Sequence, residues 1–313
     1  MLSTKSRAAA VSVASNTLLI LLKLIAGLIT GSISLIAEAI HSSMDLVAAL
    51  IAFFSVRISD TPADREHPFG HGKWENVSGV LEAILIFVGA GVIVSQAVRR
   101  LFTGEPLETL ELGIGIMALS LIVNITVSRM LLRVSKKTDS IALEADARHL
   151  TTDVLTMSGV LLGLLAVRIG QLFHINLNII DPIVALGVAL LIIRTAFDLV
   201  RRSFGPLVDV RLPEAEEKQI ISVINEHTSQ LAGFHEVRTR KSGSQRFVDL
   251  HLMLPKNASV EEAHKMCDHL EQDIASKLPH CSVTIHVEPC DAACSACQVA
   301  GCNFKIGMQY GRQ

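Results

Sequence analysis

The chain has 313 residues, of which 50% are hydrophobic and 19% are charged, and its formal net charge is −2. A near-neutral balance without a basic patch argues against nucleic acid as a partner. The mean hydropathy of +0.46 favours a membrane protein instead.

Six apolar stretches follow one another in the first two thirds of the chain. Each has about 20 residues, enough for a helix to cross ~30 Å of hydrocarbon at ~1.5 Å per residue. The sequence therefore predicts an α-helical membrane protein with six transmembrane helices in residues 1–205. The stretches lie near residues 9–30, 33–56, 77–98, 110–132, 150–171 and 179–199.

Basic residues predict how these helices lie in the lipid bilayer. In a six-span protein, most of the basic residues near span ends fall on one side, among them Lys5, Arg57, Lys136 and Arg201. Arg99 and Arg100 lie on the other side and weaken this bias without reversing it. The positive-inside rule then places both termini in the cytoplasm.

The second and fifth spans carry the same motif, a histidine followed four residues later by an aspartate. The pairs are His41 with Asp45 and His149 with Asp153. This spacing puts both side chains on one helix face, about one turn apart. If the two helices face each other, two imidazoles and two carboxylates surround one point, as a tetrahedral zinc-like cation requires. Ionisable groups are costly in lipid, so the motifs predict a site for metal passage.

The loop between the second and third spans contains Asp64, His67 and His71. Pro68 and Gly70 exclude a long helix there, so these side chains converge only if the loop folds back on itself. Two interpretations stay open, an exposed zinc site or a polar cytoplasmic loop that happens to hold two histidines.

Other polar residues within or near the spans have less specific interpretations. Glu82 is expected to face the interior of the helix bundle, and Asp146 to have a structural role or to line an access path. Asn16 and Asn124 are expected to form hydrogen bonds between helices.

The composition changes after residue 205, where Pro206 and Pro213 precede a charged run. Residues 206–289 predict a cytoplasmic domain with the order helix (214–230), strand (235–241), strand (246–254), helix (259–278) and strand (282–288). Residues 248–253 alternate in polarity with period two, and Gly243 supplies a hairpin turn. An α-β-β-α-β order of this length predicts a two-layer α/β domain of the ferredoxin or metallochaperone type.

The final segment, residues 290–313, is rich in cysteine. A cytoplasmic location disfavours structural disulfides, so the tail either binds zinc or another soft cation or carries reduced thiols. The possible thiol ligands are Cys290, Cys294, Cys297 and Cys302. Four histidines have no partner at ligand spacing and are predicted to be surface residues, namely His174, His227, His269 and His280.

Three motifs in this order carry a family resemblance. His41-x-x-x-Asp45, the loop string HPFGHGK (67–73) and His149-x-x-x-Asp153 precede a small α/β domain. Together they resemble the cation diffusion facilitator family, which transports zinc and other divalent metals, and in particular its bacterial ferrous-iron and zinc efflux members. The resemblance covers nearly the whole chain up to about residue 290.

The resemblance implies a homodimer in the bacterial inner membrane that exports divalent metal from the cytoplasm in exchange for protons. Zn²⁺ would be both the substrate and a structural or regulatory ion. The implied transport site is His41, Asp45, His149 and Asp153, and the implied loop site is Asp64, His67 and His71. The implied binuclear site of the cytoplasmic domain draws on His235, His251, His264, His286 and Glu288.

The same resemblance implies a charge pair and two differences from relatives. Lys73 and Asp209 match residues that form a charge pair at the membrane boundary in relatives. Some bacterial relatives have Asp in place of His41, which changes metal selectivity. An Asp is also common in relatives at the position of Glu288. The Glu of this chain keeps a carboxylate ligand there but alters the geometry of the site.

A mechanism follows from charge alone. Two carboxylates and two neutral imidazoles balance a divalent cation, whereas the empty site leaves two negative charges in a low-dielectric setting. Proton uptake relieves that charge, so metal binding expels protons. Alternating exposure of such a site gives metal–proton antiport, while a channel would need weaker coordination at several sites.

Two other classes of protein fit the sequence less well. A membrane metalloenzyme needs an open coordination position and a general base, and the sequence has no H-E-x-x-H motif. A metal sensor without transport would leave His41 and Asp153 with no reason to lie in the membrane. The ligand set does not rank Zn²⁺ against Cd²⁺, Co²⁺, Ni²⁺ or Fe²⁺.

Overall fold

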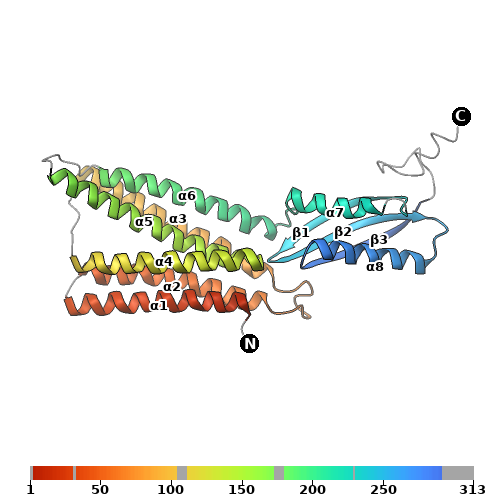
Figure 1. Cartoon of the computed structure of the whole chain (residues 1–313), viewed down its shortest axis with the longest axis horizontal. Helices are drawn as coiled ribbons and strands as arrows, with labels where there is room; N and C mark the ends of the chain where they lie inside the picture. Colours follow the sequence, from red (N-terminus) through yellow and green to blue (C-terminus); the bar gives the residue numbers. More distant parts are fainter. Residues whose placement is uncertain (1–2, 31–32, 104–110, 173–179, 228–229, 291–313) are drawn as a thin grey trace. The chain divides into compact units, whose positions relative to one another are not determined.

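The computed structural model divides the chain into two units, Met1–Leu207 and Val208–Gln313 (Figure 1). The residues that it describes are 3–30, 33–103, 111–172, 180–227 and 230–290. Each unit has its own buried core, so each is described separately.

The described residues of the first unit form six long helices. Five of them contain stretches that are long and apolar enough to cross a membrane. The exception is α5, whose first half carries Glu144, Asp146, His149 and Asp153. The helices are α1 (Thr4–Thr30), α2 (Ile33–Ser59), α3 (Lys73–Thr103), α4 (Glu111–Thr138), α5 (Ile141–Leu172) and α6 (Ile180–Leu207).

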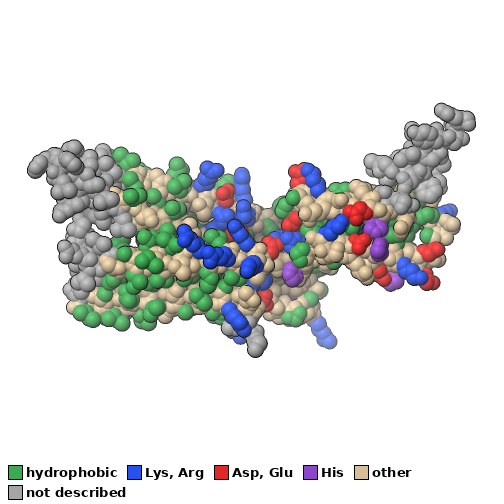
Figure 2. Space-filling model, viewed as in Figure 1, with side chains coloured by type: hydrophobic (Ala, Val, Ile, Leu, Met, Phe, Trp, Pro, Cys, Tyr) green, Lys and Arg blue, Asp and Glu red, His purple; other side chains and the backbone are tan. Residues whose placement is uncertain are grey.

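Small residues let these helices approach closely, and large apolar residues cover the outside. The longest shared interfaces are those of α3 with α6, α1 with α2 and α4 with α5. A Cβ atom at Gly79 of α3 would lie 2.2 Å from Ser203 Oγ of α6, so a larger residue there would displace the Ser203 side chain. Hydrophobic side chains such as Leu28, Val88 and Leu190 are exposed over the bundle (Figure 2), as expected of a lipid-facing surface.

The second unit is a three-stranded sheet with two helices. Its elements are α7 (Glu214–Glu226), β1 (Gly233–Ser242), β2 (Gln245–Pro255), α8 (Val260–Lys277) and β3 (Cys281–Cys290). The central strand β2 pairs antiparallel with β1 and parallel with β3. The α8 crossover makes the parallel pairing possible. The predicted helical membrane fold with a C-terminal α-β-β-α-β domain is therefore confirmed.

Local sequence signals explain where the elements of this domain begin and end. Gly243 has φ +58° in the turn between β1 and β2, as predicted. At the start of α8, Ser259 Oγ accepts a hydrogen bond from the Glu262 N–H at 3.2 Å in a capping box. Helix α7 ends at Glu226, earlier than predicted, because the His227 N–H bonds to the Ile224 carbonyl and tightens the last turn.

The core of the domain fixes which side chains remain available for binding. The β2 residues Val248, Leu250 and Leu252 are buried against helix residues that include Ile220 of α7 and Leu270 of α8. Since side chains alternate along a strand, His251 points to the opposite face of the sheet. The domain therefore has one face covered by helices and one face that carries histidine.

Candidate metal sites

The two His-x-x-x-Asp motifs meet between α2 and α5. Asp45 Oδ1 lies 3.4 Å from His149 Nε2, and ligand atoms of Asp45, His149 and Asp153 all lie within 4.8 Å of one another. Ligands at about 2.0–2.1 Å from a tetrahedral zinc ion are themselves about 3.3–3.4 Å apart. The Asp45–His149 separation therefore fits two ligands of one cation.

His41, the fourth predicted ligand, lies one helical turn before Asp45 on α2. The backbone places the two residues on the same helix face. The side chain of His41 lies outside the described residues, so its part in the site stays a prediction.

Buried polar groups surround this cluster. His149 is 7% exposed, and its Nδ1 has no hydrogen-bond partner among the described residues. Asn16 Nδ2 donates to the Asp45 carbonyl at 3.4 Å, in line with the predicted contact between helices. Lys23 is 1% exposed, and its Nζ donates a hydrogen bond at 2.7 Å to Oγ of Ser42, the residue that follows His41. A buried lysine inside a span was a signal of function that the sequence interpretation did not use.

Two further acids lie inside the bundle. Glu82 of α3 is fully buried, which confirms that it faces the interior. Asp146 of α5 is 1% exposed and precedes His149 by three residues. Burial of Asp146 is compatible with both roles predicted for it.

The loop between α2 and α3 folds back as one of its two interpretations requires. Asp64 carboxylate oxygens lie 3.5 Å from His67 Nδ1 and 3.5 Å from His71 Nε2. Asp64 Oδ1 also accepts hydrogen bonds from the backbone N–H groups of Glu66 and His67, and the His67 bond is the main reason why the pKa of Asp64 is lowered. Gly70 has φ +80° and closes the turn. The three groups are thus within reach of one metal ion.

A third cluster lies on the histidine-bearing face of the cytoplasmic sheet. Glu288 accepts from His235 at 3.0 Å and from His251 at 2.9 Å. These hydrogen bonds, led by the one from His235, lower the pKa of Glu288. His251 is in register with both His235 on β1 and His286 on β3. His286 Nε2 is 3.9 Å from Glu288 Oε1.

His264 is not brought into this cluster within one chain. It lies on α8, its side chain is 76% exposed, and its Nδ1 lies 3.7 Å from Asp268 Oδ1 of the same helix. Its role as a ligand therefore stays a prediction.

The remaining predicted residues are placed as follows. Lys73 Nζ donates to the Leu207 carbonyl at 3.4 Å, and Asp209 Oδ1 lies 4.0 Å from Arg240. Lys73 and Asp209 belong to different units, so their pairing stays a prediction. Cys290 is buried at the end of β3. The other tail thiols, Cys294, Cys297 and Cys302, lie outside the described residues.

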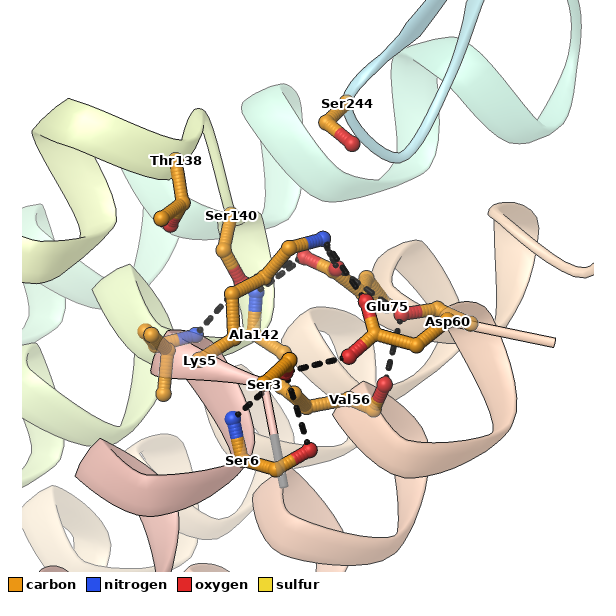
Figure 3. Close-up of polar contacts among 12 residues, drawn as sticks. Ser3, Lys5, Ser6, Val56, Asp60, Glu75, Thr138, Ser140, Ala142 and Ser244 are labelled. Atoms are coloured by element: carbon orange, nitrogen blue, oxygen red, sulfur yellow. Dashed lines mark hydrogen bonds and ion pairs between the residues drawn. The ribbon is translucent and has the colours of Figure 1, made fainter. Parts of the chain in front are cut away.

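A buried ionic cluster that no sequence motif predicted surrounds Glu75 (Figure 3). Glu75 is fully buried near the start of α3 and accepts hydrogen bonds from Lys5 Nζ at 2.9 Å, Ser59 Oγ at 2.9 Å and Ser140 Oγ at 2.5 Å. Lys5 also lies 3.4 Å from Asp60. The cluster thus joins α1, α2 and α3 to the turn before α5. Its members are far apart in sequence and have no common spacing, so no motif indicated it.

The comparisons with known proteins agree with this fold. Residues 9–208 match the cation efflux transmembrane domain, and residues 212–290 match the cytoplasmic domain of cation efflux proteins. The two matches cover most of the chain. The chain belongs to the cation efflux family, the cation diffusion facilitators, and is a membrane metal-efflux transporter.

Individual relatives are similar over most of their length. The chain is 39% identical to the uncharacterized transporter sll1263 of Synechocystis, over 86% of this chain and 85% of that protein. It is 33% identical to the cation-efflux pump FieF of Salmonella paratyphi A, over 91% of this chain and 93% of that pump. A solved structure of CzrB in its zinc form is 36% identical and covers 25% of this chain and 90% of that chain, with a TM-score of 0.25.

Proposed function

We propose that this transporter exchanges a zinc-class divalent cation for protons and exports the metal from the cytoplasm. The observation that carries the proposal is the 3.4 Å separation of Asp45 Oδ1 and His149 Nε2, on two membrane helices and beside Asp153. With His41, the site offers two imidazoles and two carboxylates, the nitrogen and oxygen set that suits Zn²⁺.

Charge balance supports the coupling to protons. Two carboxylates neutralise a divalent cation, and the nearly buried position of His149 means that little water is available to stabilise the empty site. When the metal leaves, protons that bind to the ligand side chains restore neutrality. Binding of the next metal ion then releases them. Alternate exposure of the site to the two sides couples inward proton flow to outward metal flow.

The direction of transport rests on the orientation in the membrane. Lys and Arg side chains gather toward the end of the bundle at which α1 begins (Figure 2). By the positive-inside rule, this end faces the cytoplasm in a bacterial inner membrane. The loop site and the cytoplasmic cluster are then exposed to cytoplasmic metal. They serve as structural or regulatory sites, and the cytoplasmic domain holds a homodimer together.

Ligand type alone does not rank the zinc-class metals at this site. The same four ligands also accept Cd²⁺, Co²⁺, Ni²⁺ or Fe²⁺, because affinity orders overlap for such sites. Competition by each of these ions against zinc during transport ranks them directly.

Reconstitution into proteoliposomes tests the proposal. We expect zinc uptake by the parent protein and none by Asp45→Ala or Asp153→Ala, since each change removes a ligand and one compensating charge. Glu144→Gln is a matched control on α5, because Glu144 is paired with Arg148 and Arg202 outside the cluster. Near-normal uptake by the double variant Asp45→Ala/Asp153→Ala would contradict the proposed site. Zinc binding by the parent protein without any uptake would favour a sensor instead.

A further inference from the structure

A fourth group of potential ligands lies on the helix-covered side of the cytoplasmic domain. His227 follows the last residue of α7, and His269 and Asp273 lie one turn apart on α8. Their ligand atoms all lie within 4.8 Å of one another. Both histidines were predicted to be surface residues without partners. His269 does lie at the surface, with its side chain 60% exposed, whereas His227 is only 8% exposed. The prediction that they lack partners is wrong for both, because the packing of α7 against α8 brings them together.

Both imidazoles converge on the same carboxylate oxygen. His227 Nε2 lies 3.2 Å from Asp273 Oδ2, and His269 Nε2 lies 3.6 Å from it. The centroids of the two rings are 5.0 Å apart, and the ring planes make an angle of 80°. The two separations bracket the spacing of about 3.3–3.4 Å between ligands of a tetrahedral zinc ion.

The other ring nitrogen of His227 has its protonation fixed by a backbone hydrogen bond. Its Nδ1 lies 3.0 Å from the Val223 carbonyl, which can only accept, so Nδ1 carries the hydrogen. In the neutral ring, Nε2 then has a lone pair directed at a carboxylate oxygen that is also an acceptor. Only a cation between them, a proton or a metal ion, makes this arrangement favourable. A histidine whose second nitrogen donates to a backbone carbonyl is the common form of a zinc ligand.

The site is held in place without metal. His227 is 8% exposed, and next to it Lys277 of α8 pairs with Glu226 of α7 at 2.7 Å. Both helices are also anchored in the domain core through Val223 and Ile274. The three ligands are therefore preorganised, and the loss of one of them leaves the packing of α7 on α8 in place.

We propose that His227, His269 and Asp273 form a further binding site for a zinc-class divalent cation, separate from the His235–His251–Glu288 cluster. The two sites lie on opposite sides of the sheet, because His251 faces away from the helices. Three protein ligands leave one coordination position for water. Bound metal clamps the end of α7 to α8, so this site responds to cytoplasmic zinc independently of the histidine-bearing face.

Chemical modification of histidines in the full-length protein in detergent tests this site, because it reports each histidine separately. The protein is stripped with a chelator, treated with diethyl pyrocarbonate with and without Zn²⁺, and digested for mass spectrometry. We expect zinc to suppress modification of His269, whose side chain is 60% exposed, and of His227. Exposed His280 belongs to none of the groups found among the described residues and should react equally in both conditions.

Zinc counting gives a second and independent readout. We expect His269→Ala and Asp273→Asn each to bind one zinc ion per chain fewer than the parent. The matched control His280→Asn should bind as many as the parent, since Asn tolerates the positive φ of +55° at that position. Equal modification of His269 with and without zinc, while His251 becomes protected, would overturn the proposal. An unchanged zinc count in both ligand variants would overturn it as well.

Discussion

Asp45 Oδ1 on α2 lies 3.4 Å from His149 Nε2 on α5, although the two residues are 104 positions apart. The contact joins the two membrane motifs into one cluster. If this cluster is the proposed transport site, a shift of α2 against α5 would change its metal affinity. Such a coupling is what the proposed alternating-access carrier requires, because the substrate must be released after the helices move.

Metal selectivity should depend on the histidine of α2. We expect His41→Asp to transport Mn²⁺ and Fe²⁺ better and Zn²⁺ less well, since a carboxylate replaces a borderline nitrogen ligand. Competition assays with each cation in proteoliposomes measure the change. Identical competition profiles for the variant and the parent would show that His41 does not determine selectivity.

The buried Lys5–Glu75 pair should stabilise the helix bundle. Lys5→Met leaves the carboxylate of fully buried Glu75 without its cation, and we expect a loss of about 3 kcal/mol in the free energy of unfolding. Denaturant unfolding in detergent measures the loss. The double variant Lys5→Met/Glu75→Leu should regain part of the stability, because the unpaired charge is gone. A double variant less stable than Lys5→Met alone would argue against a charge effect.

The cytoplasmic domain should bind zinc through its histidine-bearing face. Residues 208–313 form a separate unit with its own core, so we expect this fragment to fold and to bind more than one zinc ion per chain. His251→Ala combined with His286→Ala should reduce zinc binding and the compaction that accompanies it. Calorimetry and small-angle scattering measure these two effects.

The cysteine tail needs a parallel control, because it could supply the binding by itself. The control replaces four cysteines with serine, at Cys290, Cys294, Cys297 and Cys302. If zinc binding and compaction survive in the histidine variant and vanish in the cysteine variant, the cytoplasmic site has been assigned to the wrong residues.

The capping box of α8 should make the stability of this domain depend on pH. The backbone N–H of Ser259 lowers the pKa of Glu262 below its ordinary value. A lowered folded-state pKa stabilises the fold above the unfolded-state value of about 4.3. The stabilisation disappears as the pH falls through the folded-state pKa. The stability difference between the parent and Glu262→Gln, followed by circular dichroism in urea, should therefore be full at pH 7 and shrink in acid. A difference that does not change with pH would exclude the charge of Glu262 as its cause.

Sequence periodicity was sufficient to predict the helices and strands and the contacts within each of them. The spacing of four predicted that His149 and Asp153 share a helix face, and alternation along β2 predicted that His251 lies opposite Leu250. Contacts between different helices and strands were harder to predict from the sequence. The meeting of α2 with α5 was first assumed from the ligand chemistry of the two motifs and was then implied by the family resemblance, because nothing in the spacing fixes which helices face each other.

The missed sites share one physical reason. His227 approaches Asp273 only because α7 packs on α8, and Glu75 binds Lys5 only because α1 packs near the start of α3. Such pairs depend on tertiary packing and leave no periodic signal. His269 and Asp273 do have the i, i+4 spacing that was used elsewhere in the chain, so half of that site could have been recognised from the sequence.

Simultaneous measurement of zinc and proton flux in proteoliposomes under an imposed pH gradient tests metal–proton exchange most directly. We expect zinc to enter the vesicles as protons leave them. Asp153→Asn should abolish both fluxes together, while Glu144→Gln should preserve both. Zinc flux that continues without proton movement in the parent protein, or that persists in Asp153→Asn, would contradict a metal–proton exchange site formed by Asp45, His149 and Asp153.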